Sequence, residues 1–332
     1  MATATTNRKR VLVTETFAAS GMALLQGRSD IEVLTFPNGI GQPDFNALLR
    51  AHAPVHAVAL GPTRFGEDEL ESSGDMRVVT RIGVGFDAID LPALSRRNVP
   101  LMTVGTANSP SVAEAALFMM MALAKRGAEL DALVKEGRWA ERLGGIPFDL
   151  LGKTLVVIGF GRIGSRLVKR CVAMEMNVQV YDPFKAAADV AAAGAEAVDD
   201  LDAALAGADF VSIHCPKSPE TVGLFDAARL ARLKPTAYLV NTARGGIVDE
   251  AALHAALTGG LLAGAGLDVF AQEPPQPDNP LFKLANVITA PHLAGVTREA
   301  LDRMGLQTAK NILSAFDGDI IRENVINKDV LG

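Results

Sequence analysis

Residues 154–182 read TLVVIGFGRIGSRLVKRCVAMEMNVQVYD, and this stretch determines the predicted fold. Its beginning, Thr154–Ile158, is a short β-branched apolar run that is typical of a buried parallel strand. The run leads directly into Gly159-Phe160-Gly161-Arg162-Ile163-Gly164, after which apolar residues recur at helical spacing. A second strand, Val178–Tyr181, ends at Asp182. Strand, glycine turn, helix and strand in this order predict a βαβ unit of a doubly wound parallel sheet.

Each glycine of this turn has its own expected task. Gly159 would form the tight turn, Gly161 would let the backbone approach a pyrophosphate, and Gly164 would let the helix pack closely on the strand. The phosphates would lie at the positive end of the helix, near its unpaired N–H groups. Asp182 is placed where a carboxylate accepts from the hydroxyls of an adenine ribose and repels a 2′-phosphate. A glycine turn alone can be purely structural, but this context favours a dinucleotide site, with NAD preferred over NADP.

The composition predicts a globular protein with two domains. The chain has 332 residues, of which 49% are hydrophobic and 21% are charged, so each domain can bury its own core. The formal net charge is −6 and the basic residues are scattered, which favours neither a nucleic acid nor a membrane partner. The longest apolar run, 115–124, is too short to span a bilayer.

Three further patterns bear on location and metals. The beginning, MATATTNRKR, lacks the apolar segment of a secretory signal, and we expect a frayed tail there. Two cysteines, Cys171 and Cys215, are most simply interpreted as free thiols of a cytoplasmic protein. No cluster of His, Cys or Asp has ligand spacing, so no metal is expected.

The chain alternates strands and helices on both sides of a long helix expected over 109–125. Strands are expected at Val11–Thr14, Glu32–Phe36, Ala57–Leu60, Val78–Ile82, Leu101–Val104, Phe210–Ile213, Tyr238–Val240, Leu262–Leu267 and Val287–Thr289. Residues 127–151 are expected to form an irregular arm of the kind that packs on another subunit, so a homodimer is expected. The last helix, 297–316, should return to the first domain. We therefore predict an α/β protein with two doubly wound parallel-sheet domains: a Rossmann NAD-binding domain over 106–297 and a flavodoxin-like, discontinuous substrate-binding domain over 1–105 and 298–332.

Three ionisable residues follow separate strands of the second sheet: Arg244, Glu273 and His292. Taken singly, each is more often a surface or structural residue, but carboxyl ends of parallel strands converge. Arg244 offers a planar cation for a carboxylate and a neighbouring carbonyl oxygen. His292 can give a proton to an alkoxide or take one from an alcohol, and Glu273 can orient its imidazole and stabilise the cation. His214 is the competing base, although it is more simply interpreted as ordering the cofactor loop.

Seven stretches of this chain resemble the D-isomer-specific 2-hydroxyacid dehydrogenases, which include D-3-phosphoglycerate dehydrogenases and glyoxylate/hydroxypyruvate reductases. The stretches are GVGFDAID, NSPSVAE, GKTLVVIGFGRIG, HCPKSPET, VNTARGGIVDE, LDVFAQEP and APHLAG. The resemblance implies that Arg244 binds substrate, that Glu273 partners the histidine and that His292 is the acid/base. The positions that the glycine motif and the resemblance together assign to NAD are Val84, Gly159, Gly161, Arg162, Ile163, Gly164, Asp182, Cys215, Thr242, Ala243, Asp268, Ala294 and Gly295. The positions assigned to substrate are Arg81, Val84, Gly85 and Arg244.

The leading hypothesis is NAD-dependent hydride transfer at C2 of a small 2-hydroxy or 2-keto acid, of the hydroxypyruvate/glyoxylate or phosphoglycerate type. Phosphoglycerate dehydrogenases commonly carry Arg near Leu60, and related formate dehydrogenases carry Gln in place of Glu273. An alternative is a non-enzymatic NAD(H)-sensing module, because the same fold serves as a transcriptional corepressor in animals. A third hypothesis is NAD-linked oxidation of an inorganic anion. These three hypotheses can be distinguished by measuring the consumption of NADH in the presence of a panel of keto acids.

Overall fold

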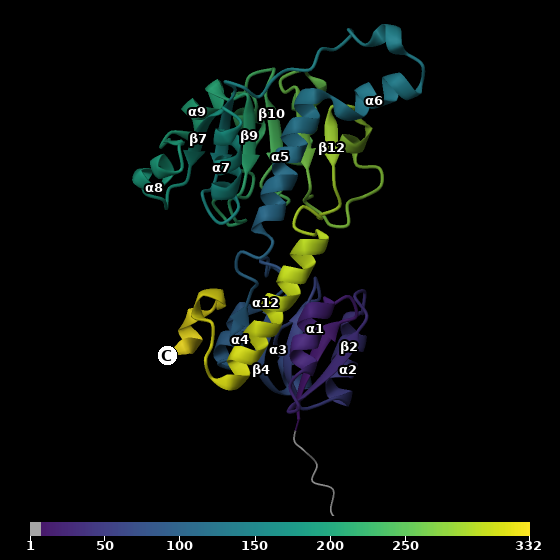
Figure 1. Ribbon diagram of the computed structural model, residues 1–332, viewed down its shortest axis with the longest axis vertical. Coiled ribbons are helices and arrows are strands. Elements are labelled where there is room, and N and C mark those ends of the chain that lie inside the picture. Colours follow the sequence, from purple (N-terminus) through teal and green to yellow (C-terminus); the bar gives the residue numbers. More distant parts are fainter. Residues whose placement is uncertain (1–7) are drawn as a thin grey trace, which may run out of the picture. The chain divides into compact units, whose positions relative to one another are not determined.

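Two parallel sheets are present, one in each of two units of the chain. The structure is a computed structural model that describes residues 8–332, so most of the N-terminal stretch predicted to be a frayed tail lies outside the described residues. Unit 1 combines the chain up to Asn108 with Val296–Gly332, and unit 2 is Ser109–Gly295 (Figure 1). The sequence placed the divisions at 105/106 and 297/298. In the described part of the chain, no helix is long and apolar enough to cross a membrane.

Unit 1 contains a five-stranded sheet with the strand order β2-β1-β3-β4-β5. Its elements are β1 (Lys9–Thr14), α1 (Ala19–Gln26), β2 (Ile31–Phe36), α2 (Gln42–Ala51), β3 (Val55–Leu60), α3 (Glu67–Ser73), β4 (Gly74–Arg81), α4 (Leu91–Arg96), β5 (Leu101–Met102), α12 (Arg298–Asp317), η3 (Arg322–Asn324) and η4 (Lys328–Leu331). All pairings are parallel, and the order is that of flavodoxin-like sheets. This agrees with the predicted fold of the first domain.

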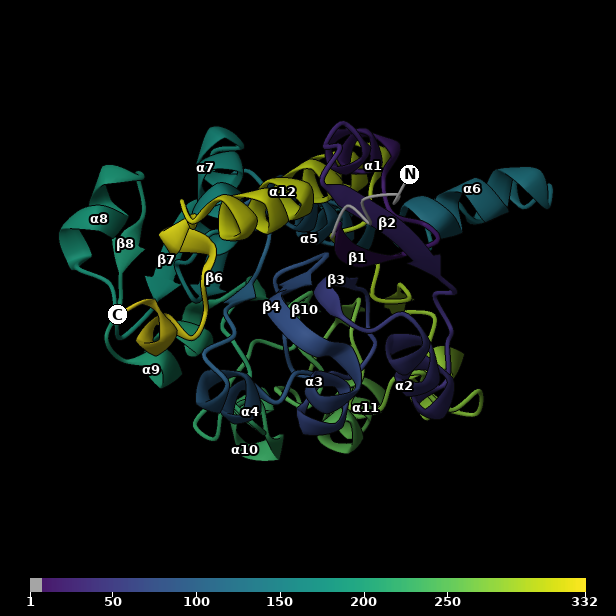
Figure 2. The same cartoon turned by 90° about the horizontal axis from the view of Figure 1, so that it is seen from below.

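Helices cover both faces of this sheet, as expected for a doubly wound domain. Alternation along β1 sends Leu12 into the core that packs against α2 and α4, and sends Val11 and Val13 into the core that packs against α1 and α12. Figure 2 shows the same layers, with α1 and α12 on one side of β4 and with α2, α3 and α4 on the other. The returning helix α12 is therefore an integral layer of unit 1.

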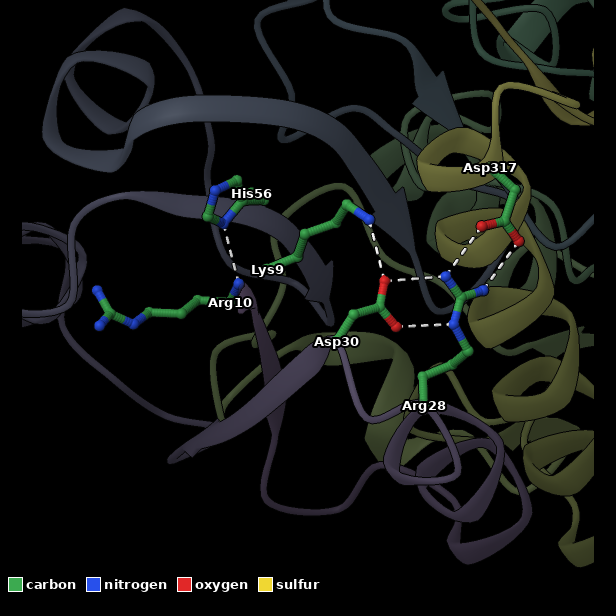
Figure 3. Close-up of polar contacts among 6 residues, drawn as sticks. All are labelled: Lys9, Arg10, Arg28, Asp30, His56 and Asp317. Carbon is green, nitrogen blue, oxygen red and sulfur yellow. Dashed lines mark hydrogen bonds and ion pairs between the residues drawn. The ribbon is translucent and has the colours of Figure 1, made fainter. Parts of the chain in front are cut away.

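An ionic cluster fastens the end of α12 to the beginning of the chain (Figure 3). Arg28, just after α1, donates from Nε to Asp30 at 2.8 Å and from a terminal nitrogen to Asp317 at 2.9 Å. Lys9 of β1 donates to Asp30 as well, at 3.1 Å. Hydrogen bonds from Arg28 hold the pKa of Asp30 well below its usual range. The cluster joins segments that are far apart in sequence, so it closes the discontinuous unit.

Unit 2 contains a seven-stranded parallel sheet with the order β12-β11-β10-β9-β6-β7-β8. Its elements are α5 (Ser109–Lys125), α6 (Gly127–Lys135), η1 (Trp139–Glu141), β6 (Thr154–Ile158), α7 (Gly164–Ala173), β7 (Asn177–Tyr181), α8 (Ala187–Ala192), β8 (Glu196–Ala197), α9 (Leu201–Gly207), β9 (Phe210–Ile213), α10 (Ala227–Leu230), β10 (Tyr238–Asn241), α11 (Glu250–Thr258), β11 (Gly264–Leu267), η2 (Pro280–Lys283) and β12 (Val287–Thr289). Counted from β6, this is the Rossmann order with one additional strand. The two faces have separate cores: Leu155 and Val157 pack with α5 and α7, and Val156 and Ile158 pack with α9 and α11.

The fold differs from the sequence expectation in several places. Strand β4 begins at Gly74 rather than Val78, and β5 ends at Met102 rather than Val104. The two-residue strand β8 was not predicted, because Glu196–Ala197 is too short to show a periodicity. The segment 127–151, expected to be irregular, begins with the helix α6. Strand β11 begins at Gly264 rather than Leu262, because Leu262 is buried in the preceding turn and extends the apolar run beyond the strand.

Candidate functional site

The glycine turn after β6 has the geometry that the motif predicts. Gly159 has a φ of 94°, in the left-handed region, and a Cβ there would lie 2.9 Å from the backbone nitrogen of Cys215. A Cβ on Gly164 would lie 2.0 Å from the carbonyl oxygen of Gly159, so only glycine lets α7 begin this close to the strand. A Cβ on Gly161 would meet nothing within 4 Å. Gly161 is thus not needed for packing, which suits a role in the approach of a ligand.

Asp182 connects the two strands of this βαβ unit. Its Oδ2 accepts from the backbone N–H of Phe160 at 2.7 Å, and its Oδ1 accepts from that of Phe184 at 3.0 Å. Each carboxylate oxygen has a second lone pair, so hydrogen bonds to ribose hydroxyls remain feasible. Asp182 therefore stabilises the glycine turn, in addition to any contact that it makes with a ligand. The sequence did not reveal this structural role.

The loops after β9 and β10 contain two buried polar atoms without a partner in the described chain, Nδ1 of His214 and Oγ1 of Thr242. The other ring nitrogen of His214 lies 2.8 Å from Ser212 Oγ. Burial lowers the pKa of His214 to about 4, so the ring is neutral near pH 7 and poorly suited to be an acid. His214 lies against Gly159 of the glycine turn, and unpartnered buried polar atoms in these loops fit a polar cofactor. Cys215, the next residue, has a thiol whose pKa burial raises to about 11.

Glu273 and His292 are in direct contact. His292 Nδ1 lies 2.7 Å from Glu273 Oε2, and the other oxygen of Glu273 accepts from the backbone N–H of Phe270 at 3.0 Å. The side chains are 48% and 36% exposed for His292 and Glu273, respectively, so the pair is accessible to a substrate. With Nδ1 bonded to a carboxylate, Nε2 is the nitrogen that can exchange a proton with a ligand.

The loop that carries His292 is anchored by Asp268, at the end of β11. The backbone N–H groups of Leu293 and Ala294 donate to the two carboxylate oxygens of Asp268, at 2.8 and 2.9 Å. The backbone N–H of His292 donates to the carbonyl of the same residue, at 2.8 Å. Burial raises the pKa of Asp268. Asp268 was assigned to the cofactor from the sequence. In the structure its hydrogen bonds hold the loop that runs from His292 to Gly295.

Arg244 lies on the loop after β10, the strand next to β11. Asn241 shapes this loop: its Nδ2 donates to the carbonyl of Arg244, and its Oδ1 accepts from the N–H of Ala243. A Cβ on Gly245 would lie 1.7 Å from the carbonyl oxygen of Phe270, so the Arg244 loop is in backbone contact with the loop that carries Glu273. The three strand ends therefore do bring their loops together, as predicted.

The substrate residues assigned from unit 1 lie after β4. Arg81 ends that strand, and its Nε donates to the carbonyl of Gly85 at 2.8 Å, which closes the loop around Val84. Val84 packs on the small core formed by Val104, Ala300 and other side chains of unit 1. Arg81 thus shapes the loop whose N–H groups were assigned to the substrate. In residues 8–332, no group of three His, Cys, Asp or Glu side chains is arranged to hold a metal ion.

Comparisons with known proteins agree with this architecture. Residues 117–294 match the family model "D-isomer specific 2-hydroxyacid dehydrogenase, NAD binding domain". A D-3-phosphoglycerate dehydrogenase of Archaeoglobus fulgidus is 38% identical over 320 residues, which cover 96% of this chain and 59% of that protein. A glyoxylate reductase of Thermococcus litoralis is 34% identical over 331 residues, covering 98% of each chain.

Solved structures give the same result. The TT0316 protein of Thermus thermophilus superposes with a TM-score of 0.84 and 32% identity, covering 96% of this chain and 99% of that one. D-lactate dehydrogenase from Aquifex aeolicus, complexed with NAD and lactic acid, superposes with a TM-score of 0.82 and 27% identity, covering 95% and 98%. The chain belongs to the D-isomer specific 2-hydroxyacid dehydrogenase family. It spans about 59% of the length of the phosphoglycerate dehydrogenase that it matches.

Proposed function

We propose that this protein is an NAD-dependent dehydrogenase that transfers a hydride between NAD(H) and C2 of a small 2-hydroxy or 2-keto acid. The observation that carries the proposal is the hydrogen bond between Glu273 and His292, formed beside the Arg244 loop in a Rossmann unit. An oriented imidazole next to a permanent cation is what the reduction of a keto acid requires.

The cofactor is proposed to bind on the glycine turn of unit 2. The pyrophosphate would lie over Gly161, Arg162 and Ile163 at the beginning of α7, and Asp182 would accept from the adenine ribose and disfavour NADP. The nicotinamide end would be lined by Cys215, Thr242, Ala243, Asp268, Ala294 and Gly295. The buried oxygen of Thr242 supports this assignment, because a cofactor amide or ribose would satisfy it.

In the proposed reaction the bound dinucleotide supplies the hydride to C2. Arg244 binds the substrate carboxylate and polarises the neighbouring carbonyl. His292 donates the proton on Nε2 to the oxygen at C2, while Glu273 stabilises the imidazolium before transfer. In the oxidation direction the neutral imidazole takes the proton from the hydroxyl.

The class of acid is tested with a panel of keto acids. The names of the relatives indicate phosphoglycerate for some and glyoxylate for others. At the position where phosphoglycerate dehydrogenases commonly carry Arg, this chain has Leu60, which is fully buried. We expect the protein to oxidise NADH with at least one of glyoxylate, hydroxypyruvate, pyruvate and phosphohydroxypyruvate. The reaction is monitored by the loss of NADH absorbance in the near ultraviolet. NADH binding without turnover on every member of the panel would reject the enzyme and favour the NAD(H)-sensing alternative.

We propose that the protein is a cytoplasmic homodimer. The support for the dimer is a group of apolar side chains on α5, α6 and the arm that follows, each more than half exposed: Phe118, Val134, Trp139, Leu143, Ile146 and Leu151. Figure 1 shows α6 and the arm extending away from the sheet of unit 2. The support for the location is that Cys171 and Cys215 are both free.

A further inference from the structure

Glu250, the first residue of α11, directs its carboxylate to a neighbouring loop. Its Oε1 accepts from the backbone N–H of Ala271 at 2.5 Å, and its Oε2 accepts from Nδ2 of Asn279 at 3.0 Å. Ala271 and Asn279 lie on either side of Glu273 in the sequence. One carboxylate thus holds both ends of the segment that carries Glu273.

These contacts are separate from the capping of α11. The N-cap of the helix is Asp249, whose Oδ1 accepts from the backbone N–H groups of Ala251 and Ala252 at 2.9 and 3.0 Å. Among the hydrogen bonds of the described chain, both of those made by the Glu250 side chain leave its own helix. The helix would therefore begin in the same way without Glu250.

The beginning of this loop is fixed by the buried side chains of Val269 and Phe270, whereas its middle is exposed and depends more on hydrogen bonds. Residues 268–279 form no helix or strand, and most of residues 271–278 are exposed. A segment with few buried contacts opens at low free energy unless hydrogen bonds hold it. Within the loop, Asn279 donates its N–H to the carbonyl of Gln276, and Phe270 donates to Glu273. Asn279 also caps η2, where its Oδ1 accepts from the N–H of Leu281 at 3.0 Å, and Glu250 supplies the two bonds that tie the loop to α11.

We infer that Glu250 is a positioning residue: it fixes the loop that carries Glu273 and thereby orients the imidazole of His292. This inference rests on the proposed function and adds a residue to it. The hydrogen bond between Glu273 and His292 requires both groups to be placed within a few tenths of an ångström, and a displacement of about 1 Å at a reacting group can cost about 100-fold in rate. Glu250 acts only through the loop, because its carboxylate bonds Ala271 and Asn279.

The inference predicts that chemistry suffers more than substrate binding. The Arg244 loop has its own support from Asn241, so it keeps its shape when Glu250 is lost. We expect Glu250→Ala to lower kcat for the best keto acid by about tenfold or more, while the KM for that acid and the Kd for NADH change less than about threefold. We also expect a larger primary isotope effect with NADH deuterated at the transferred position, because hydride transfer becomes more rate-limiting.

Two matched variants separate positioning from general structure. Glu250→Gln keeps one acceptor for the N–H of Ala271 and should restore part of the lost kcat. Asp249→Ala removes the N-cap of the same helix, which lowers the stability of the helix, and should leave kcat within about twofold. Equal losses of kcat in Glu250→Ala and Asp249→Ala, or no recovery in Glu250→Gln, would overturn the inference.

Hydrogen exchange supplies a readout that needs no substrate. In Glu250→Ala, peptides that cover residues 268–280 should exchange faster than in the wild type, whereas peptides of β10 and α11 should not. If the wild type reduces no keto acid, the proposed function fails and the positioning role fails with it. If the wild type is active and Glu250→Ala shows normal kcat and normal exchange, only the role of Glu250 is rejected.

Discussion

His292 has a backbone conformation that a histidine alone would disfavour. Its φ is 55°, in the left-handed region, which costs a non-glycine residue of order 1 kcal/mol and is concentrated at functional sites. Three hydrogen bonds from residues 292–294 to Asp268 offset that cost. The result is an imidazole whose direction is fixed by its own backbone and by Glu273, which a proton-transfer group requires.

Arg244→Ala should abolish most turnover and leave NADH binding intact. A guanidinium that binds a carboxylate in a dry site contributes several kcal/mol, whereas the proposed dinucleotide contacts lie on other residues. We expect kcat/KM for the best keto acid to fall by far more than about tenfold, or roughly 1.4 kcal/mol, with the Kd for NADH within about twofold. Arg232→Ala, which removes a surface guanidinium of the same unit, is the control. A fall in kcat/KM of less than about tenfold would contradict the assignment of Arg244 to the substrate site.

Asp182 should set the choice of cofactor. In Asp182→Ala the ribose contacts and the repulsion of a 2′-phosphate both disappear, so the ratio of kcat/KM for NADH over NADPH should fall by about tenfold or more. The variant also loses the bonds to Phe160 and Phe184 that hold the turn. Asp182→Asn keeps one oxygen that can accept from the N–H of Phe160 or of Phe184, so it separates the loss of ribose recognition from the loss of the turn. This variant should bind NADH more tightly than Asp182→Ala. An unchanged cofactor ratio in both variants would contradict the assignment.

At the level of elements, the sequence predicted every strand except the two-residue β8, because each of the others lies in a mainly apolar run. β6, β9 and β12 have the predicted bounds, because each run is apolar and ends in a turn signal. The strand-end rule also predicted that Glu273 and His292 would meet. It could not predict the roles of Glu250, Asn241 or the backbone contacts of Asp268, because these depend on loop conformations that carry no periodicity.

The pairing of β1 with β3 contains a buried, pH-sensitive residue. His56 of β3 is 4% exposed, and its Nδ1 accepts from the backbone N–H of Arg10 at 2.9 Å (Figure 3). Burial, with the nearby cations Arg77, Arg10 and Lys9, lowers the pKa of His56 below 6.5, while Asp75 opposes the shift. Because the folded-state pKa is the lower one, protonation favours the unfolded state. Stability is therefore lost as pH falls below the unfolded value of about 6.5, until the folded pKa is reached.

Hydrogen exchange can test this loss for β1 and β3. Between about pH 7.5 and about pH 5.5 the wild type should lose protection in peptides from these strands, after correction for intrinsic exchange rates. His56→Gln keeps an acceptor for Arg10 but cannot be protonated, so its protection should depend less on pH over the same range. His254→Gln, in unit 2, should retain the wild-type dependence. If the protection of these peptides depended on pH equally in the wild type and in His56→Gln, a group other than His56 would be responsible for the loss of stability.

On the scale of the whole molecule, the two units follow the same construction rule with different strand orders. Both place helices on two faces of a parallel sheet, and the sequence predicted this from the alternation of strands and helices. The Rossmann order in unit 2 follows from its glycine turn, which marks the first strand. The short edge strand β8 and the helix α6 were missed, because one is too short for a pattern and the other lies in a segment expected to be irregular.

The exposed arm gives the last prediction, which concerns assembly. Trp139 and Ile146 are 62% and 74% exposed, and Leu143 and Leu151 of the same segment are also mostly exposed. Large exposed apolar patches mark interaction surfaces. If two copies bury these surfaces against each other, Trp139→Glu and Ile146→Asp should each place a charge in the interface and shift sedimentation from dimer toward monomer at micromolar concentration. Phe184→Glu is the matched control, because Phe184 is 92% exposed but lies outside the arm, so it should remain a dimer. A wild type that sediments as a monomer at these concentrations, or arm variants that stay dimeric, would reject the arm as the interface.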